Sequence, residues 1–515
     1  MTSTRALVWF KRDLRIRDHR PLAQAREHGD ALAVFVFEPE WLSSPEFDPA
    51  HAEFTLGCLA ELRGSLARWG LPLLVLRAPM IEVLETLHRQ YSFTHLLSHQ
   101  ETGPAWSWTR DRAVARWCEV KGVCWEESSQ TGVVRGLTDR NGWAARWQSL
   151  MDAPACRSEG EYRGVPIGGV SVSSLPTLSD LGLRPSGRRL QAPGEAAATQ
   201  LLNGFLSGRG RDYRQALSSP LSAESGCSRL SPHLAFGTLS MRTVHQATEQ
   251  QIAQTSDRSL AWGLRGFAGR LRWHCHFMQK LEDEPAIELQ NFARHCDGLR
   301  ESSFDEGRFA AWCEGRTGFP MVDACMRSLK ATGWLNFRMR AMLVSFASYH
   351  LWLHWRPTGL FLARQFLDFE TGIHWSQMQM QSGTTGINTL RIYSPTKQAR
   401  DHDPQGRFIR RWVPELREVP IAWLAQPWLM DAATQSASGC RIGIDYPSPL
   451  VDETQALRAA RDRLHALRQT DTARDEADRI QVRHGSRRSG LPPTTRAARG
   501  PRTPVVDDRQ ARLFD

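Results

Sequence analysis

The chain has 515 residues, of which 41% are hydrophobic and 23% charged, so it can bury a large core and divide into about two or three domains. Its net charge of +10 suits a phosphate-rich partner such as DNA without requiring one. No run of about 18 apolar residues is free of charge and no secretory leader is present, so we expect a cytoplasmic protein without membrane spans. The ten scattered cysteines lack a CxxC pair, and no metal-ligand spacing appears, so no metal site is predicted.

The first third of the chain predicts a doubly wound α/β domain, which we place at residues 1–135. Helix-period segments at about 54–68, 80–89 and 106–120 separate short apolar runs, a pattern typical of a parallel sheet covered by helices. The apolar runs are RALVWF, ALAVFVFEP, LPLLVLRA, THLLSHQ and VCWEE. No G-x-G-x-x-G follows the first run, so an ordinary dinucleotide-binding site is not expected.

The remaining chain predicts a linker, a helical domain and a tail. Residues from about Pro154 to Ala198 are rich in Gly, Pro and Ser and predict a long interdomain linker, which we place at residues 136–198. Helical periodicity predicts an all-α domain over residues 199–465. Residues 466–515 are rich in Arg, Pro and Gly and predict a basic, largely disordered tail.

One apolar segment of the helical domain resembles a membrane span in length. WLNFRMRAMLVSFASYHLWLHW has apolar residues at helical spacing but also carries Arg338, Arg340, His350 and His354. These charges predict a single buried helix of a soluble domain.

Three segments together resemble the photolyase/cryptochrome family of blue-light flavoproteins. LVWFKRDLRIRDHRPLAQA is similar to the family's opening strand and loop, and RDYRQALSSPLSAESGCSRLSPHLAFGTLS to its first flavin-binding segment. Gly315–Leu416 is similar to the remaining flavin-binding segments. The likeness covers roughly residues 5–465, in family order. It implies an α/β domain that holds an antenna chromophore of the folate or deazaflavin type in some members, followed by a helical domain that holds FAD.

The candidate cofactor residues follow partly from chemistry and partly from the resemblance. The run from Gly226 to Ser231 offers backbone N–H groups, hydroxyls and an arginine to a pyrophosphate, although a plain serine N-cap would use the same residues. The resemblance places Arg340 and Asp368 beside the flavin ring; otherwise they would be interpreted as a buried ion pair. The candidates are Tyr213, Cys227, Ser228, Arg229, Leu230, Ser231, Phe267, Arg270, His274, Phe337, Arg340, Asp368, Glu370 and His374.

The resemblance also points to the residue that faces flavin N5. Counting forward from Asp368 puts His374 there, or Ile373 if the alignment gap lies earlier. A histidine in that position would be a titratable proton donor. The alternative interpretation is a core histidine bonded to a backbone carbonyl.

The substrate-facing positions depart from the family. Cyclobutane-dimer photolyases carry a Trp-x-x-Glu-x-x-Trp-Arg pattern whose glutamate hydrogen-bonds the flipped-out dimer. Here Trp273 remains, but Arg270 replaces the glutamate, so an acceptor becomes a donor. Phe337 replaces an asparagine that touches flavin and lesion, Ala341 replaces the methionine of dimer photolyases or the catalytic histidine of (6-4) photolyases, and Met378 replaces a tryptophan. Neither known lesion pocket is predicted to be intact.

The family passes electrons to the photoexcited flavin along three tryptophans. Trp355 matches the middle member and Trp375 the member nearest the flavin, whereas Ser302 stands at the distal place. Trp352, one helical turn before Trp355, is predicted to substitute for the distal member. Core packing is the alternative role for each of them, because the chain has 19 tryptophans.

Weaker signals concern the antenna and DNA. Glu101 resembles the glutamate through which some members bind a folate, although a strand-end carboxylate is also a common capping group. Arg338, Arg410 and Arg411 are candidate phosphate contacts.

Two functions compete on this sequence: a photolyase-like or cryptochrome-like photoreceptor, and a light-dependent DNA photolyase for pyrimidine dimers or (6-4) products. The departures at Arg270, Phe337, Ala341 and Met378 favour the photoreceptor, and a repair enzyme for an unusual lesion is a third possibility. We expect a monomer; the sequence indicates no signalling partner.

Overall fold

A five-stranded parallel sheet with strand order β3-β2-β1-β4-β5 forms the first domain. The computed structural model describes residues 4–165, 174–388 and 390–484. The strands are β1 Arg5–Phe10, β2 Asp30–Val36, β3 Leu73–Leu76, β4 His95–His99 and β5 Cys124–Ser128. Each lies within or almost within one of the predicted apolar runs. β1 and β2 bury both faces and therefore show no alternation of apolar and polar residues.

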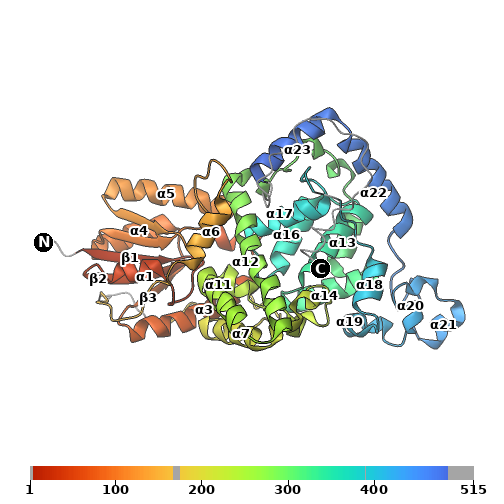
Figure 1. The fold of residues 1–515 in the computed structure, drawn as a ribbon, viewed down its shortest axis with the longest axis horizontal. Coiled ribbons are helices and arrows are strands. Elements are labelled where there is room, and N and C mark those ends of the chain that lie inside the picture. Colours follow the sequence, from red (N-terminus) through yellow and green to blue (C-terminus); the bar gives the residue numbers. More distant parts are fainter. Residues whose placement is uncertain (1–3, 166–173, 389, 485–515) are drawn as a thin grey trace.

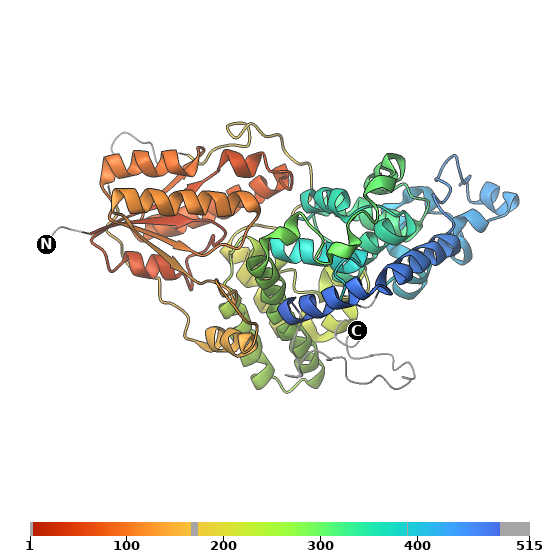
Figure 2. The same cartoon turned by 90° about the horizontal axis from the view of Figure 1, so that it is seen from above.

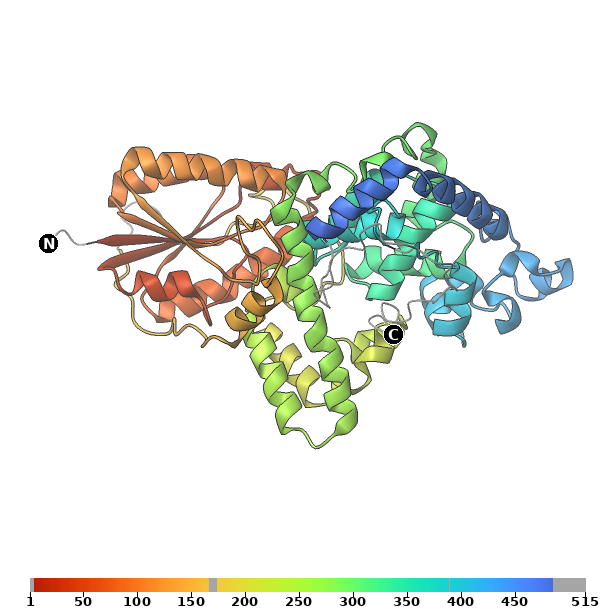
Figure 3. The ribbon, with the colours of Figure 1, turned by 45° about the horizontal axis from the view of Figure 1, so that its top comes forward.

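Helices cover both faces of this sheet (Figures 1 and 3). Side chains of α1 and α3 pack on one face and those of α4 and α5 on the other, which confirms the predicted α/β architecture. The helices of this region are α1 Arg20–Ala25, α2 Pro39–Leu42, α3 Pro49–Arg68, α4 Met80–Tyr91, α5 Ala105–Lys121 and α6 Trp143–Asp152. Helix α6 lies in the segment expected to be a linker; residues 166–173 of that segment lie outside the described residues.

The order in which the chain adds strands to the sheet reverses between β1 and β4. The chain runs from β1 to β2 and β3 on one side, then crosses over so that β4 pairs with the other edge of β1. In parallel sheets, binding sites form at the carboxyl ends of the strands at such a point. The loop after β1 and the residues after β4 meet there, against the second domain.

The second domain is helical (Figure 1). Its α-helices are α7 Glu195–Ser207, α8 Tyr213–Ala216, α9 Ala223–Gly226, α10 Ser231–Ala235, α11 Met241–Gln254, α12 Arg258–Asp283, α13 Glu306–Glu314, α14 Pro320–Thr332, α15 Phe337–Ser345, α16 Trp355–Gln365, α17 Thr371–Ser382, α18 Pro395–His402, α19 Arg407–Trp412, α20 Ile421–Leu424, α21 Ala432–Ala437, α22 Glu453–Arg468 and α23 Asp471–His484. Among the described residues, none of the helices is sufficiently long and apolar to cross a membrane.

The two domains meet along α12, the long green helix in Figure 3, and at the loop between α16 and α17. Arg12 donates to the carbonyl of Phe369 at 3.0 Å, and the imidazole of His51 contacts the carbonyl of Phe366 at 3.0 Å. The loop that carries Asp368 is therefore held in place by the α/β domain.

Two predictions are corrected. The segment expected to be one helix is broken: α15 ends at Ser345, a π-helical turn spans Phe346–His350, and α16 begins at Trp355. The tail expected to be largely disordered from residue 466 contains α23, which lies across the helical domain together with α22 (Figure 2). Residues 485–515 lie outside the described residues.

Candidate functional site

A cavity of about 290 Å³ opens in the helical domain, between α12, α15, α17 and the loop before α10. It gathers most of the predicted residues from segments far apart in the sequence. Those that line it are Tyr213, Cys227, Ser228, Arg229, Ser231, Arg270, Trp273, His274, Phe337, Arg340, Ala341, Asp368, Glu370, His374 and Met378. Leu230 and Phe267 do not line it; they are buried in the core cluster behind Tyr213 and support the wall instead.

One wall of the cavity carries a fixed positive charge. Arg340 forms a bidentate pair with Asp368 at 2.9 and 2.8 Å and donates to the carbonyl of Leu335 at 2.6 Å. Burial raises the pKa of Asp368, but the Arg340 charge and hydrogen bonds outweigh it, and the net pKa is lowered. The carboxylate stays ionised and holds the guanidinium at the cavity.

The loop before α10 presents a second cation. Arg229 adopts the left-handed region at φ 63°, and its guanidinium lies 3.8 Å from the ring centroid of Trp334. The neighbouring Cys227 is held through its carbonyl by Arg209 at 2.9 Å. Burial raises the pKa of the Cys227 thiol to about 12, so this residue acts as a neutral, small side chain.

Arg270 lies on α12 with its guanidinium 5.4 Å from the ring centroid of Phe337. The carboxylates among the described lining residues are Asp368, paired with Arg340, and Glu370, whose Oε1 lies 3.2 Å from Nε2 of His274. Each carboxylate that lines the described cavity therefore already has a partner.

His374 is a core histidine. Its Nε2 lies 2.9 Å from the carbonyl of Gly359, and its ring centroid lies 4.8 Å from that of Trp375. Burial lowers the pKa of His374 to about 3, so the imidazole is neutral and Nε2 donates to the carbonyl. The structure thus favours the packing interpretation over a titratable proton donor; Ile373 also lines the cavity.

Asn336 was not among the predicted site residues, yet it lines the cavity. It is 2% exposed, and its Nδ2 donates to the carbonyl of Leu217 at 2.9 Å. Its Oδ1 is buried without a partner among the described residues, which costs about 1–3 kcal/mol unless a ligand donates to it. Its position directly before Phe337, in a segment that resembles a flavin-binding one, was the sequence signal that could have identified it.

Two of the three predicted electron-transfer tryptophans are adjacent. The ring centroids of Trp355 and Trp375 lie 5.7 Å apart at 68°, and both residues are fully buried. The guanidinium of Arg356 lies 4.2 Å from the Trp375 centroid. Trp355 donates from Nε1 to Oδ1 of Asn291 at 2.6 Å, and Asn291 in turn donates to Asp297 at 2.8 Å.

Trp352 does not stand one helical turn before Trp355. It has φ 57° and precedes the N-cap of α16, so the argument from helical spacing is wrong. Its ring is contacted by two guanidiniums, Arg300 at 4.5 Å and Arg463 at 4.7 Å from the centroid.

The candidate DNA contacts have protein partners. Arg410 donates to the carbonyls of Gln405, Arg417 and Val419 at 2.8 to 2.9 Å, so we assign it to holding that loop. Arg338 donates to Ser218 at 2.9 Å. Arg411 lies half-exposed, 3.3 Å from Glu224, and is the most accessible of the three.

Glu101 lies at the domain junction with its carboxylate bound to Arg110 at 2.6 Å. It lines two small cavities, of about 60 and 50 Å³. Burial raises the pKa of Glu38, a second partner of Arg110, to about 7.

Comparisons with known proteins identify the family. Residues 267–466 match the model described as the FAD binding domain of DNA photolyase, and residues 6–137 match the DNA photolyase model. Cryptochrome-1 of Sinapis alba is 30% identical over 488 residues, which cover 87% of this chain and 94% of that protein. The chain belongs to the photolyase/cryptochrome family. It is a flavoprotein, and the family match accounts for the cluster of cavity residues.

Other photolyase/cryptochrome members are similarly related. The deoxyribodipyrimidine photo-lyase of Vibrio cholerae is 29% identical, with 87% of this chain and 97% of that protein covered. The crystal structure of a bacterial class III photolyase from Agrobacterium tumefaciens has a TM-score of 0.79 at 24% identity, covering 91% of this chain and 99% of that one. This last likeness shows the shared fold.

Proposed function

We propose that this protein is a blue-light photoreceptor whose FAD is photoreduced through Trp375 and Trp355, and that it does not repair cyclobutane dimers or (6-4) products. The observation that carries the proposal is the cavity's charge. Arg270 replaces the lesion-binding carboxylate, and the acids that line the described cavity already have partners.

The cavity residues fit FAD. Arg229 and Arg340 supply cations for a pyrophosphate and for the electron-rich side of a flavin ring, and the unpaired Oδ1 of Asn336 can accept from a ligand N–H group. When bound, FAD supplies a ring that absorbs blue light and accepts an electron. The protein's part is to hold the ring, exclude water and deliver that electron.

Arg270 disfavours a pyrimidine dimer for a physical reason. The N–H groups of a flipped base need an acceptor, and a guanidinium offers donors alone. A buried base N–H that faces a guanidinium is left without an acceptor, which costs about 1–3 kcal/mol.

The charges around the tryptophans set the direction of electron flow. A guanidinium over an indole opposes removal of an electron from that ring, because the ring would then carry a like charge. Trp375 has Arg356 above it and Trp352 has two such arginines, whereas Trp355 donates to the Asn291–Asp297 hydrogen-bond chain. Once Trp375 has donated its electron, Trp355 refills it and retains the positive charge until an external reductant replaces the electron.

A DNA photolyase is the second candidate. The retained Trp273 at the cavity wall and the half-exposed Arg411 favour it, and several relatives bear that name. Glu101 and its two cavities remain our prediction for an antenna site, whose chromophore the residues do not specify.

A repair assay separates the two candidates. The FAD-loaded protein, with reductant, is illuminated with oligonucleotides that carry a cyclobutane dimer or a (6-4) product, and a deoxyribodipyrimidine photo-lyase serves as positive control. We expect no light-dependent loss of either lesion. Light-dependent repair of either one by the wild type would overturn the proposal. Arg270→Glu combined with Phe337→Asn then tests whether these two residues account for the inactivity.

A further inference from the structure

Two clusters of histidine and carboxylate side chains lie in the α/β domain. One is Asp13, His19 and His99, which is fully buried; the other is His28, His95 and Glu126, which is partly exposed. In each, one ligand-type atom per residue lies within 4.8 Å of the others. Hydrogen-bond geometry shows which of them has lone pairs left for a cation.

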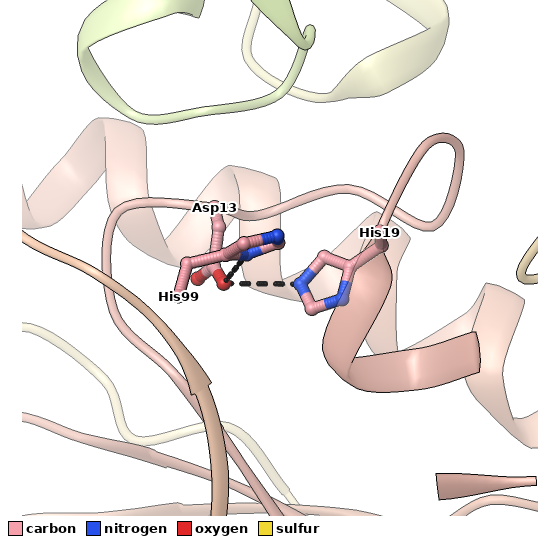
Figure 4. A group of neighbouring side chains, drawn as sticks. All are labelled: Asp13, His19 and His99. Carbon is pink, nitrogen blue, oxygen red and sulfur yellow. Dashed lines mark hydrogen bonds and ion pairs between the residues drawn. The ribbon is translucent and has the colours of Figure 1, made fainter. Parts of the chain in front are cut away.

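The buried cluster is a hydrogen-bond hub (Figure 4). The backbone N–H of Leu22 donates to Nδ1 of His19 at 3.2 Å, so in the neutral imidazole the proton sits on Nε2. Nε2 then donates to Oδ2 of Asp13 at 3.0 Å, and His99 donates to the same oxygen at 2.7 Å. The nitrogen of His19 that faces the carboxylate has no lone pair for a metal, and the hub joins the loop after β1 to α1 and β4.

The second cluster has the opposite polarity at His95. The hydroxyl of Thr94 donates to the carbonyl of Arg5 at 3.2 Å, and it lies 2.9 Å from Nδ1 of His95. When that hydroxyl donates its single proton to the carbonyl, it accepts from Nδ1 of His95. In that tautomer the lone pair of His95 is on Nε2. A ring nitrogen that donates to a fixed oxygen while the other remains basic is the usual arrangement of a metal-binding histidine.

The other two residues complete a set of acceptors. Glu126 has one carboxylate oxygen oriented by the amide of Gln24 at 2.8 Å. The ring centroid of His28 lies 4.2 Å from that of His95, with the two ring planes 34° apart. Two imidazoles and a carboxylate thus bring one ligand-type atom each to within 4.8 Å of the others, as a shared cation requires.

We propose that His28, His95 and Glu126 bind one divalent transition-metal ion of the Zn²⁺ class, with water completing its coordination. Imidazole nitrogen and carboxylate oxygen are the ligands that Zn²⁺ takes in proteins, and three protein ligands leave a position for water. The ligands come from the turn after α1, from β4 and from β5, so the ion ties three segments of the sheet edge together. The sequence showed no metal motif because these residues are far apart in the chain.

Titration with Zn²⁺ tests the site directly. The full-length FAD-loaded protein, without a polyhistidine tag and stripped with chelator, is titrated by calorimetry, and Co²⁺ is used as a visible-absorption probe. We expect about one equivalent of binding, weakened at least about tenfold in His95→Gln and in Glu126→Gln. Equal binding by the wild type and by the double variant His95→Gln/Glu126→Gln, or no binding by the wild type, would overturn the proposed site.

Two controls separate this site from other ligands. Cys124→Ser removes the exposed thiol of β5, and His465→Gln removes an exposed histidine of α22; neither is expected to change the stoichiometry. Loss of the equivalent in either variant would assign the metal elsewhere and overturn the proposal. Flavin absorption and circular dichroism confirm that each variant is folded. The proposal does not depend on the light-driven function, so either can fail alone.

Discussion

Asp368 shows how a single side chain sets the charge of the cavity. It is buried, pairs with both terminal nitrogens of Arg340, and sits on a loop that Arg12 and His51 of the α/β domain hold. The family match named both members of this pair. It did not show that the other domain braces the loop, because Arg12 and His51 make these bonds to backbone carbonyls, for which the sequence has no side-chain signal.

Asp368→Asn is expected to lower the free energy of unfolding by about 2 kcal/mol, less than a fully buried pair would cost because Arg340 is partly exposed. FAD retained per mole of protein should fall with it, measured by flavin absorption and urea unfolding. The lowered pKa of Asp368 gives the sign of the pH effect: the pair contributes fully above the usual carboxyl range and is lost as pH falls through the lowered pKa.

Asp445→Asn is the matched control, because Asp445 pairs with Arg441 at 3.0 Å on the surface. Its urea midpoint should stay close to that of the wild type, because exposed ion pairs contribute little to stability. An equal effect of the two substitutions would contradict the role given to Asp368.

At the scale of elements, α12 carries a buried lysine close to its C-terminal end. Lys280 has its Nζ 5.3 Å from the ring centroid of Phe277, and burial, then Arg140, lower its pKa to about 7. Between that value and the ordinary lysine pKa the unfolded chain binds a proton that the folded chain does not. The buried lysine therefore destabilises the fold most at and below about pH 7, and stability rises as the pH increases toward the ordinary lysine pKa.

Lys280→Met is expected to stabilise the protein at pH 7 and to flatten the rise between pH 7 and 9.5. Methionine is a good helix former and carries no charge into the core. Urea midpoints at the two pH values measure it. Lys121→Met, a half-exposed lysine paired with Glu85, should leave the pH profile unchanged; a steep profile that persists in Lys280→Met would refute the assignment.

The break between α15 and α16 depends on another buried cation. Arg300 donates to the carbonyls of Ser348, in the π-helical turn, and Ser382, at the end of α17, at 2.9 and 3.1 Å. Arg300→Met should cost about 3 kcal/mol by leaving both carbonyls unpaired. Arg463→Met removes the exposed arginine on the other side of Trp352 and should cost far less. Equal unfolding midpoints for the two variants would contradict this account.

The same break explains why one predicted helix was wrong. Apolar spacing continues from Trp334 to Trp355, so periodicity alone gives no sign of a stop. Pro357 was the overlooked signal: a proline suits the first turn of a helix, and here it follows the His354 N-cap of α16. The positions of β1 and β2 were predictable, by contrast, because each is a short apolar run buried on both faces.

At the scale of the whole molecule, the cavity lies in the helical domain, and the α/β domain holds the loop that carries Asp368. Many of the cavity residues were predicted one by one, since they lie in blocks that the family shares, whereas Asn336 and the partners of the site residues were not. The Asn291–Asp297 chain at Trp355, the arginines over Trp352 and the His28 cluster all join segments distant in sequence, and their contacts follow from the fold alone.

Photoreduction under blue light tests the central claim, that electrons reach the flavin through Trp355. With an external reductant, the flavin absorption of the wild type should bleach under illumination. Trp355→Phe should slow bleaching on the order of tenfold or more, and Trp352→Phe should bleach nearly as the wild type does, because two arginines oppose charge on that ring. Bleaching of Trp355→Phe at the wild-type rate would contradict the account.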